Sequence, residues 1–364
     1  MISFAPTEDQ QSVIDTVQRY VREKVQRLRH DADEERGYPQ AVIDEGWRLG
    51  VMSSWVPEEL GGLGEPHSAV SAALYAEELA YGDVSLALQV LTPGLFGLPV
   101  LQFGSEAQKE RWLSQLTQDE FPKLTAALSE TGWNFDPANL KTTATRDGDS
   151  YVLNGAKVRV PLAADALAML VYANLDGQTQ AFVVEQGASG LQVGAREQLM
   201  GLRALPTYEL TLSDCRVAAS ARLGEENGLD LNKLLNISRV TVGAMGVGLA
   251  RAALENAITY AKERQAFGKY IAQFQSIAFM LAEMRMELDA ARLMVWEAAW
   301  NLDKGHEATR ECVLGAQYAD DTAMLVADRA LQIYGGHGYI REQPVESLLR
   351  NARGFATLTG AAML

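Results

Sequence analysis

Cysteine and histidine are scarce in this chain, and their scarcity excludes two classes of protein. The 364 residues include two cysteines, Cys215 and Cys312, and four scattered histidines. Two cysteines cannot form a disulfide framework, and neither has a neighbour at the spacing of a metal ligand. Because zinc sites need several close His or Cys side chains, we expect no metal site.

Positive charge is in the minority. The chain has 32 Lys and Arg residues against 47 Asp and Glu residues, which gives a formal net charge of −15. This balance argues against a general affinity for nucleic-acid phosphates or anionic membranes, although it leaves room for a local basic pocket. We therefore expect small-molecule ligands and no nucleic-acid partner.

Long apolar runs and a secretion signal are also missing. The N-terminal stretch MISFAPTEDQQ has neither the basic nor the apolar region of a signal peptide. The apolar run 163–173 contains Asp165 and is too short to cross a bilayer. These features predict no membrane span and a location in the reducing cytoplasm.

The chain has enough hydrophobic residues for a large core, and their spacing along the sequence divides it into three zones. Hydrophobic residues make up 48% of the chain and charged residues 22%, as in globular proteins. The hydrophobic period is helical over 1–120, changes to that of strands over 121–225, and is helical again over 226–364. In the middle zone, Asp147-Gly148-Asp149 and Asp176-Gly177 mark hairpins. The pattern predicts an α+β fold with an N-terminal helical domain, a middle antiparallel β domain and a C-terminal four-helix bundle.

Several short motifs occur in a distinctive order, although each is weak alone. In chain order they are Leu199-Met200-Gly201-Leu202-Arg203, Ser213-Asp214-Cys215-Arg216-Val217, Glu263–Gly268, Phe274-Gln275, Gln332–Tyr339, and Pro344-Val345-Glu346 with Arg350–Arg353. Together they resemble the acyl-CoA dehydrogenase family, and the resemblance covers essentially the whole chain. It implies the three domains above, an FAD cofactor and tetramers built as a dimer of dimers.

The resemblance also implies ligand-binding roles for particular residues. In the family, FAD bound mainly by one subunit is reached from the neighbouring subunit by residues that correspond here to Arg264, Phe267, Gln275, Gln332, Gly335 and Gly336. Leu128 and Ser129 belong to the segment that contacts the flavin ring. Arg239 and Asn236 lie where family members bind the CoA substrate.

The family's catalytic base is the first departure from the pattern. Removal of the α-proton of an acyl thioester needs a carboxylate within reach. In the family this is a glutamate near the C-terminus or, in some members, one on an earlier helix. Here Thr359 occupies the first position and Ser238 the second. Neither hydroxyl can abstract that proton unaided, so the sequence leaves the catalytic residue unassigned.

The contacts to the flavin ring are the second departure. Asn134-Phe135 replace a Gly-Ser pair of the thioester tunnel, and Arg159 replaces a tryptophan that lies against the ring. Pro161 replaces a threonine that donates near flavin N5, and it has neither a hydroxyl nor a backbone N–H. The losses fall on the face for the chain's own ring, whereas the retained residues belong to the face lent to a partner.

This asymmetry favours one subunit of a hetero-oligomer, a heterotetramer in the family's geometry. A second acyl-CoA dehydrogenase-like subunit would carry the Glu base, while this chain lends FAD-binding residues. The resemblance implies α,β-desaturation of an acyl-CoA thioester, in the β-oxidation of a fatty acid or a sterol side chain, with electron-transfer flavoprotein as electron acceptor.

Two alternatives stay open. The first is a complete homotetrameric dehydrogenase whose base is Glu130 or Asp136, although Glu130 also matches a structural glutamate of the family. The second is a flavin-free scaffold that binds acyl-CoA or an acyl carrier. The sequence does not identify the acyl group.

Overall fold

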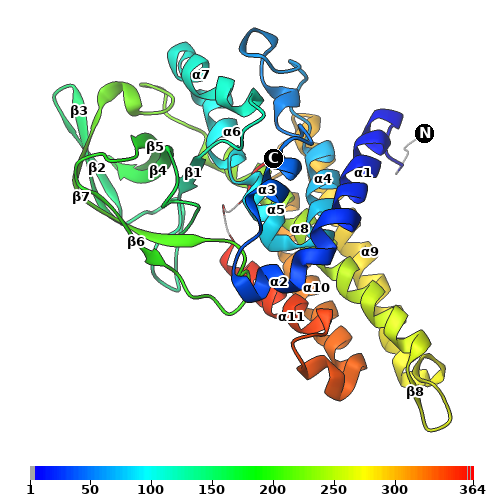
Figure 1. The fold of residues 1–364 in the computed structure, drawn as a ribbon. Helices are drawn as coiled ribbons and strands as arrows, with labels where there is room; N and C mark the ends of the chain where they lie inside the picture. The colour runs from blue at the N-terminus through cyan, green and yellow to red at the C-terminus, as the bar shows by residue number, and fades with distance from the viewer. Residues whose placement is uncertain (1–4, 359, 361) are drawn as a thin grey trace.

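A computed structural model describes residues 5–358, 360 and 362–364. Helices from the two ends of the chain pack together, and the middle third forms a sheet beside them (Figure 1). The α-helices of the N-terminal third are α1 (Glu8–Tyr20), α2 (Gln26–Glu35), α3 (Gln40–Trp47), α4 (Ala69–Gly82), α5 (Val84–Leu91), α6 (Gly94–Phe103) and α7 (Glu106–Leu113).

Local sequence explains where these helices begin and end. Thr7 caps α1, and its side chain and that of Gln10 form the reciprocal bonds of a capping box. α5 ends at Leu91 and α6 begins at Gly94, so the two helices are separated at Thr92-Pro93, where the proline has no backbone N–H to donate. A π-helical turn, Val21–Val25, follows α1.

The middle third forms one sheet with the strand order β1-β4-β2-β3-β7-β6, and β5 pairs with β4 beside this path. Its strands are β1 (Leu124–Ala127), β2 (Thr143–Asp147), β3 (Ser150–Pro161), β4 (Ala168–Leu175), β5 (Gln178–Glu185), β6 (Leu191–Arg196) and β7 (Thr207–Ala218). Both predicted hairpins are present, because β2 pairs with β3 and β4 with β5 in antiparallel register.

The sheet is mixed rather than purely antiparallel. β1 runs parallel to β4, and β2 meets β4 in parallel at one register position. Parallel neighbours need a long crossover connection. Between β1 and β4 this connection contains the whole β2–β3 hairpin, which turn signals alone could not reveal.

The C-terminal third is helical, with a small hairpin. Its elements are α8 (Leu231–Glu263), β8 (Gln265–Ala266), β9 (Lys269–Tyr270), α9 (Gln275–Asp303), α10 (Thr309–Tyr334) and α11 (Pro344–Gly354). α8 packs tightly on α4: a Cβ atom at Gly248 would lie 2.2 Å from the Glu77 carbonyl oxygen. Arg251 of α8 and Arg292 of α9 both form ion pairs with Glu77 of α4, so three helices meet at this carboxylate.

Two stretches have the length and apolarity of a membrane-crossing helix, Val84–Phe103 and Leu231–Glu263. Of their residues in the most apolar windows, 94% and 83% are buried inside the protein. Since core helices of a globular protein have the same composition, burial accounts for both stretches.

Candidate functional site

Most residues predicted to bind FAD lie at one exposed end of the helical bundle. α8 ends at Glu263, and Arg264 is its cap. The β8–β9 hairpin follows and projects beyond the bundle (Figure 1). Gln275 begins α9, and Gln332 lies in the last turn of α10. We call the set Arg264, Phe267, Gln275, Gln332, Gly335 and Gly336 the rim.

Aromatic contacts hold the two halves of the rim together. Tyr260 of α8 stacks on Tyr334 of α10, with 3.9 Å between ring centroids. The Tyr260 hydroxyl lies 3.3 Å from Nδ1 of His337, in the turn that follows α10. Arg264 and Gly335, which directly follow these helices, are therefore held at the same end of the bundle.

The rim is open to a ligand. The Arg264 side chain is exposed and makes no hydrogen bond or ion pair with any described residue, and Phe267 is 97% exposed. Cβ atoms added at Gly335 and Gly336 would meet no atom within 4 Å. A free guanidinium pairs well with phosphate oxygens, and glycines let backbone approach a ligand closely. The arrangement suits an anionic dinucleotide presented from outside this chain.

The residues predicted to contact the flavin ring line a small cavity, in contrast to the exposed rim. Leu128 and Ser129 follow β1 and line a cavity of about 30 Å³ against β3 and the C-terminal segment. Arg159, Pro161, Leu358 and Gly360 line the same cavity. Ligand pockets usually have about 300–1,000 Å³. The cavity at the flavin-ring residues is therefore about tenfold smaller than a usual ligand pocket.

Glu130, one of the two proposed alternative bases, is a structural residue. Its carboxylate is 2.8 Å from the Lys157 ammonium group, and Lys157 is fully buried. It also accepts hydrogen bonds from the backbone N–H groups of Lys141 and Thr142. Burial alone would raise the pKa of Glu130, but Lys157 and these donors lower it. Asp136, the other candidate, is exposed and accepts from the Ala138 N–H.

A second cavity, of about 250 Å³, lies between α8, α10 and the segment after α11. Ser238 and Arg239 line it, and Leu358 and Gly360 border both cavities. The structure thus brings Ser238, one family position for the base, next to the segment that carries the other. Thr359 itself lies outside the described residues.

The predicted substrate residues lie together on α8. Arg239 donates a hydrogen bond of 2.7 Å to the Asn236 side chain, and Asn236 donates to Thr309. Arg239 lines the cavity of about 250 Å³, whereas Asn236 is buried and is not among the residues that line it. Burial lowers the pKa of Arg239, as expected for a guanidinium moved away from water.

Asp320 is a candidate that the sequence reasoning missed. It carries the only carboxylate among the described residues that line either cavity. Burial and the neighbouring Asp321 raise its pKa, while Arg353 lowers it. The doublet Asp320-Asp321 was visible in the sequence. Only the packing of α10 on α8 shows that Asp320 lines the same cavity as Ser238.

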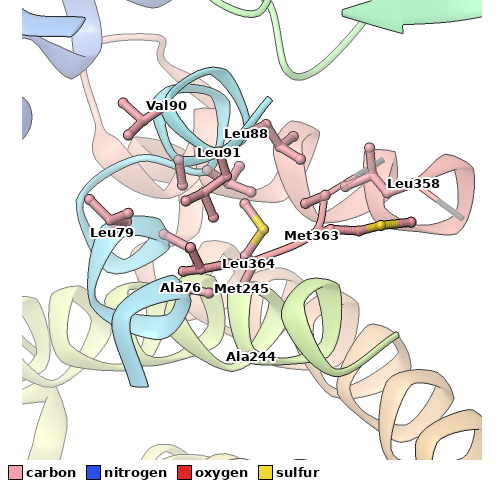
Figure 2. Packing of buried hydrophobic residues seen from close by; sticks show 14 of the residues in the cluster. Ala76, Leu79, Leu88, Val90, Leu91, Ala244, Met245, Leu358, Met363 and Leu364 are labelled. Atoms are coloured by element: carbon pink, nitrogen blue, oxygen red, sulfur yellow. The ribbon is translucent and has the colours of Figure 1, made fainter. Parts of the chain in front are cut away.

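The chain's own C-terminal residues fill the core beside these cavities. Ala362, Met363 and Leu364 are 0%, 2% and 2% exposed. Figure 2 shows Leu364 close to Ala76 of α4 and Met245 of α8. Nε2 of His67 lies 2.8 Å from the Leu364 carbonyl oxygen. Apolar space between α4, α5 and α8 is thus occupied by the chain itself.

Comparisons with known proteins agree with this architecture. Family models described as the acyl-CoA dehydrogenase N-terminal, middle and C-terminal domains match residues 7–120, 125–215 and 229–362. The chain is 34% identical over 351 residues to the caffeyl-CoA reductase-Etf complex subunit CarC of Acetobacterium woodii, covering 94% of this chain and 92% of that protein.

Other relatives are dehydrogenases. The chain is 35% identical over 363 residues to the short-chain specific acyl-CoA dehydrogenase of Megasphaera elsdenii, covering 97% and 94% of the two chains. The solved structure of butyryl-CoA dehydrogenase from that organism has a TM-score of 0.90 and 33% identity, covering 100% of this chain and 96% of that chain.

The three matched domains and the fold place the chain among flavoprotein oxidoreductases. More narrowly, the chain belongs to the acyl-CoA dehydrogenase family. FAD is the cofactor of this family, and a glutaryl-CoA dehydrogenase of Mycobacterium smegmatis has been solved with FADH2. That structure has a TM-score of 0.89 and 27% identity, covering 98% of this chain and 92% of that chain.

The residues of this chain fit only part of FAD. The rim has the donors and the open glycines that a diphosphate needs. The cavity at Leu128 and Ser129 has only about 30 Å³, well below the usual volume of a ligand pocket.

Proposed function

We propose that this chain is one subunit of a hetero-oligomeric acyl-CoA dehydrogenase and that it lends FAD-binding residues to a second, similar subunit. The observation that carries the proposal is the contrast between the exposed rim at Arg264 and the small cavity of about 30 Å³ at Leu128. A relative that is named as a subunit of a complex with Etf supports assembly with other chains.

In this proposal the two subunits divide the chemistry. The partner's glutamate removes the α-proton of the acyl-CoA thioester, because the two base positions of this chain are Ser238 and Thr359. Neither residue has a carboxylate. When bound, FAD supplies the acceptor for the β-hydride. Arg264 and Gln332 of this chain bind its diphosphate side, and electron-transfer flavoprotein receives the electrons. A cytoplasmic location and a fatty-acid or sterol side-chain substrate remain predictions.

Co-expression tests the division of labour. The chain alone, and the chain with the dehydrogenase encoded beside it, are purified and compared for bound FAD and for dye-linked oxidation of acyl-CoA. We expect yellow colour and turnover only in the two-chain preparation. Turnover by the chain alone would contradict the proposal. Calorimetric binding of acyl-CoA without flavin, even with the partner present, would instead support the scaffold.

An exposed apolar stripe on α9 gives the partner a surface. Phe279, Met286, Leu293 and Trp300 are spaced by seven residues and are 59%, 69%, 48% and 50% exposed. Residues seven apart lie on one face of a helix, and four exposed large apolar side chains in a row are typical of an interface.

A charge in this stripe should therefore prevent assembly. We expect Leu293→Asp to abolish co-purification of the partner, because a carboxylate would be buried without a counter-charge. The matched control is Leu63→Asp, which changes an exposed leucine of the N-terminal third. Sedimentation velocity measures both. An L293D chain that still assembles places the interface elsewhere.

Asp320 supports a second candidate, a complete enzyme that uses this carboxylate as its base. The two candidates predict different results for Asp320→Asn in the two-chain complex. We expect less than a twofold change in dye-linked turnover, because the partner carries the base. A general base contributes about 10²–10⁴-fold to rate, so a loss of that size would favour the complete enzyme.

The control for this experiment is Asp321→Asn. Asp321 is the exposed neighbour on α10, and its carboxylate accepts only from the Gln317 side chain among the described residues. If D320N loses turnover and D321N does not, the loss is caused by the missing carboxylate in the cavity and not by a weaker helix.

A further inference from the structure

Arg159 occupies an unusual backbone position beside the small cavity. β3 and β7 shift register between Lys157 and Val160, so Arg159 lies in an irregular part of the ladder. Its φ angle is +54°, in the left-handed region that residues with a Cβ rarely adopt. Val158 is held in place by its N–H, which donates to the Ser129 carbonyl oxygen at 3.0 Å. A bulge of this kind re-aims the side chain that it carries.

The Arg159 guanidinium lacks a partner. Its Nε atom is buried without an acceptor, and the described residues offer the group neither a hydrogen bond nor an ion pair. The side chain lines the cavity of about 30 Å³, and none of the described lining residues is an Asp or Glu. Because a buried N–H donor is costly unless it is paired, the Nε–H of this partly buried side chain is a position suited to an acceptor from a ligand.

A second orphaned group faces the same space. Thr207, the first residue of β7, is 4% exposed, and its hydroxyl has no hydrogen-bond partner among residues 5–358, 360 and 362–364. It lines the cavity with Arg159, as do Ser129 and Thr357. Buried polar groups are nearly always hydrogen-bonded, so two unpaired groups in one cavity indicate a polar ligand.

The ligand class follows from charge and size. We propose that the place where the family holds its flavin ring has become, in this chain, a binding site for a small carboxylate centred on Arg159. A guanidinium binds a carboxylate through two parallel hydrogen bonds, and the Thr207 hydroxyl can donate to the same oxygens. A cavity of about 30 Å³ favours a carboxylate with little attached to it over a larger anion. The proposal needs neither FAD nor a partner subunit, so it can fail while the proposed function stands.

Thermal unfolding of the full chain, purified without flavin or carboxylate buffers, tests the site. Acetate is the probe, and phosphate and chloride are compared at constant ionic strength. We expect acetate to raise Tm in a saturable way. A response to phosphate but not acetate, or no response to any of the anions, overturns the proposal.

Two variants tie the response to the cavity. Arg159→Met should weaken acetate binding at least tenfold, while Arg216→Met should leave it unchanged, because Arg216 is exposed on β7 and pairs with Asp147. Thr207→Val removes only the hydroxyl and should weaken acetate binding several-fold, which keeps the test valid if R159M fails to fold. An acetate response that is retained in R159M or in T207V contradicts the assignment.

Discussion

Lys157→Met is expected to destabilise the chain by about 3–5 kcal/mol, the usual cost of removing one partner from a buried ion pair. Lys157 is fully buried, and its ammonium group donates to Glu130 and to the Leu128 carbonyl oxygen. Methionine fills the space but leaves the Glu130 carboxylate uncompensated. Urea unfolding of the purified variant measures the loss.

The control for this prediction is Lys123→Met. Lys123 is exposed in the same third of the chain, and a surface substitution usually changes stability by less than about 0.5 kcal/mol. Equal losses of unfolding free energy in K157M and K123M would show that the buried ion pair does not stabilise the fold more than a surface lysine does.

The size of this loss should depend on pH. In the native protein the pKa of Glu130 lies below its ordinary value, so the stabilisation by the pair is complete at neutral pH and falls as pH decreases through that pKa. In K157M, burial without the ammonium group raises the pKa of Glu130 instead. Its carboxyl then protonates in mild acid, and the difference between the two proteins should narrow from pH 7 towards pH 5.

Arg264→Met in the two-chain complex is expected to weaken FAD retention by about 10–100-fold, the range for losing hydrogen bonds to a charged group. The side chain is exposed and unpaired among the described residues, so its removal should leave folding intact. Fluorescence of released FAD during dilution measures the dissociation constant.

Arg285→Met provides the matched control. Arg285 is also an exposed arginine, on α9, where it pairs with Asp289 at the helix surface. If R264M and R285M retain FAD equally well, the rim does not bind the cofactor and the lending of residues is wrong.

The proposals at Arg264 and Arg159 are linked by one physical contrast. Both guanidinium groups lack partners among the described residues, but the first is exposed at a helix end and the second has a buried Nε beside a small cavity. An exposed guanidinium at a helix end is accessible to a large ligand held by another chain. A donor beside a cavity of about 30 Å³ is accessible to a small anion.

The sequence by itself determined the fold class and the helix ends. In the sequence, the helical period predicts long segments that end near Arg264, Lys304 and Gly335, and α8, α9 and α10 end one residue before each of these positions. These features depend on neighbours in the chain, such as caps, turns and the spacing of apolar residues, so they can be read locally.

Tertiary structure alone decided the rest. The parallel pairing of β1 with β4, the cavity that Asp320 shares with Ser238, and the unpaired state of Arg159 each depend on segments far apart in the chain. Sequence identified Arg159 and Pro161 as substitutions in a flavin-ring site. Only packing could show that the cavity at this site has about 30 Å³, because cavity volume is set by which distant side chains meet.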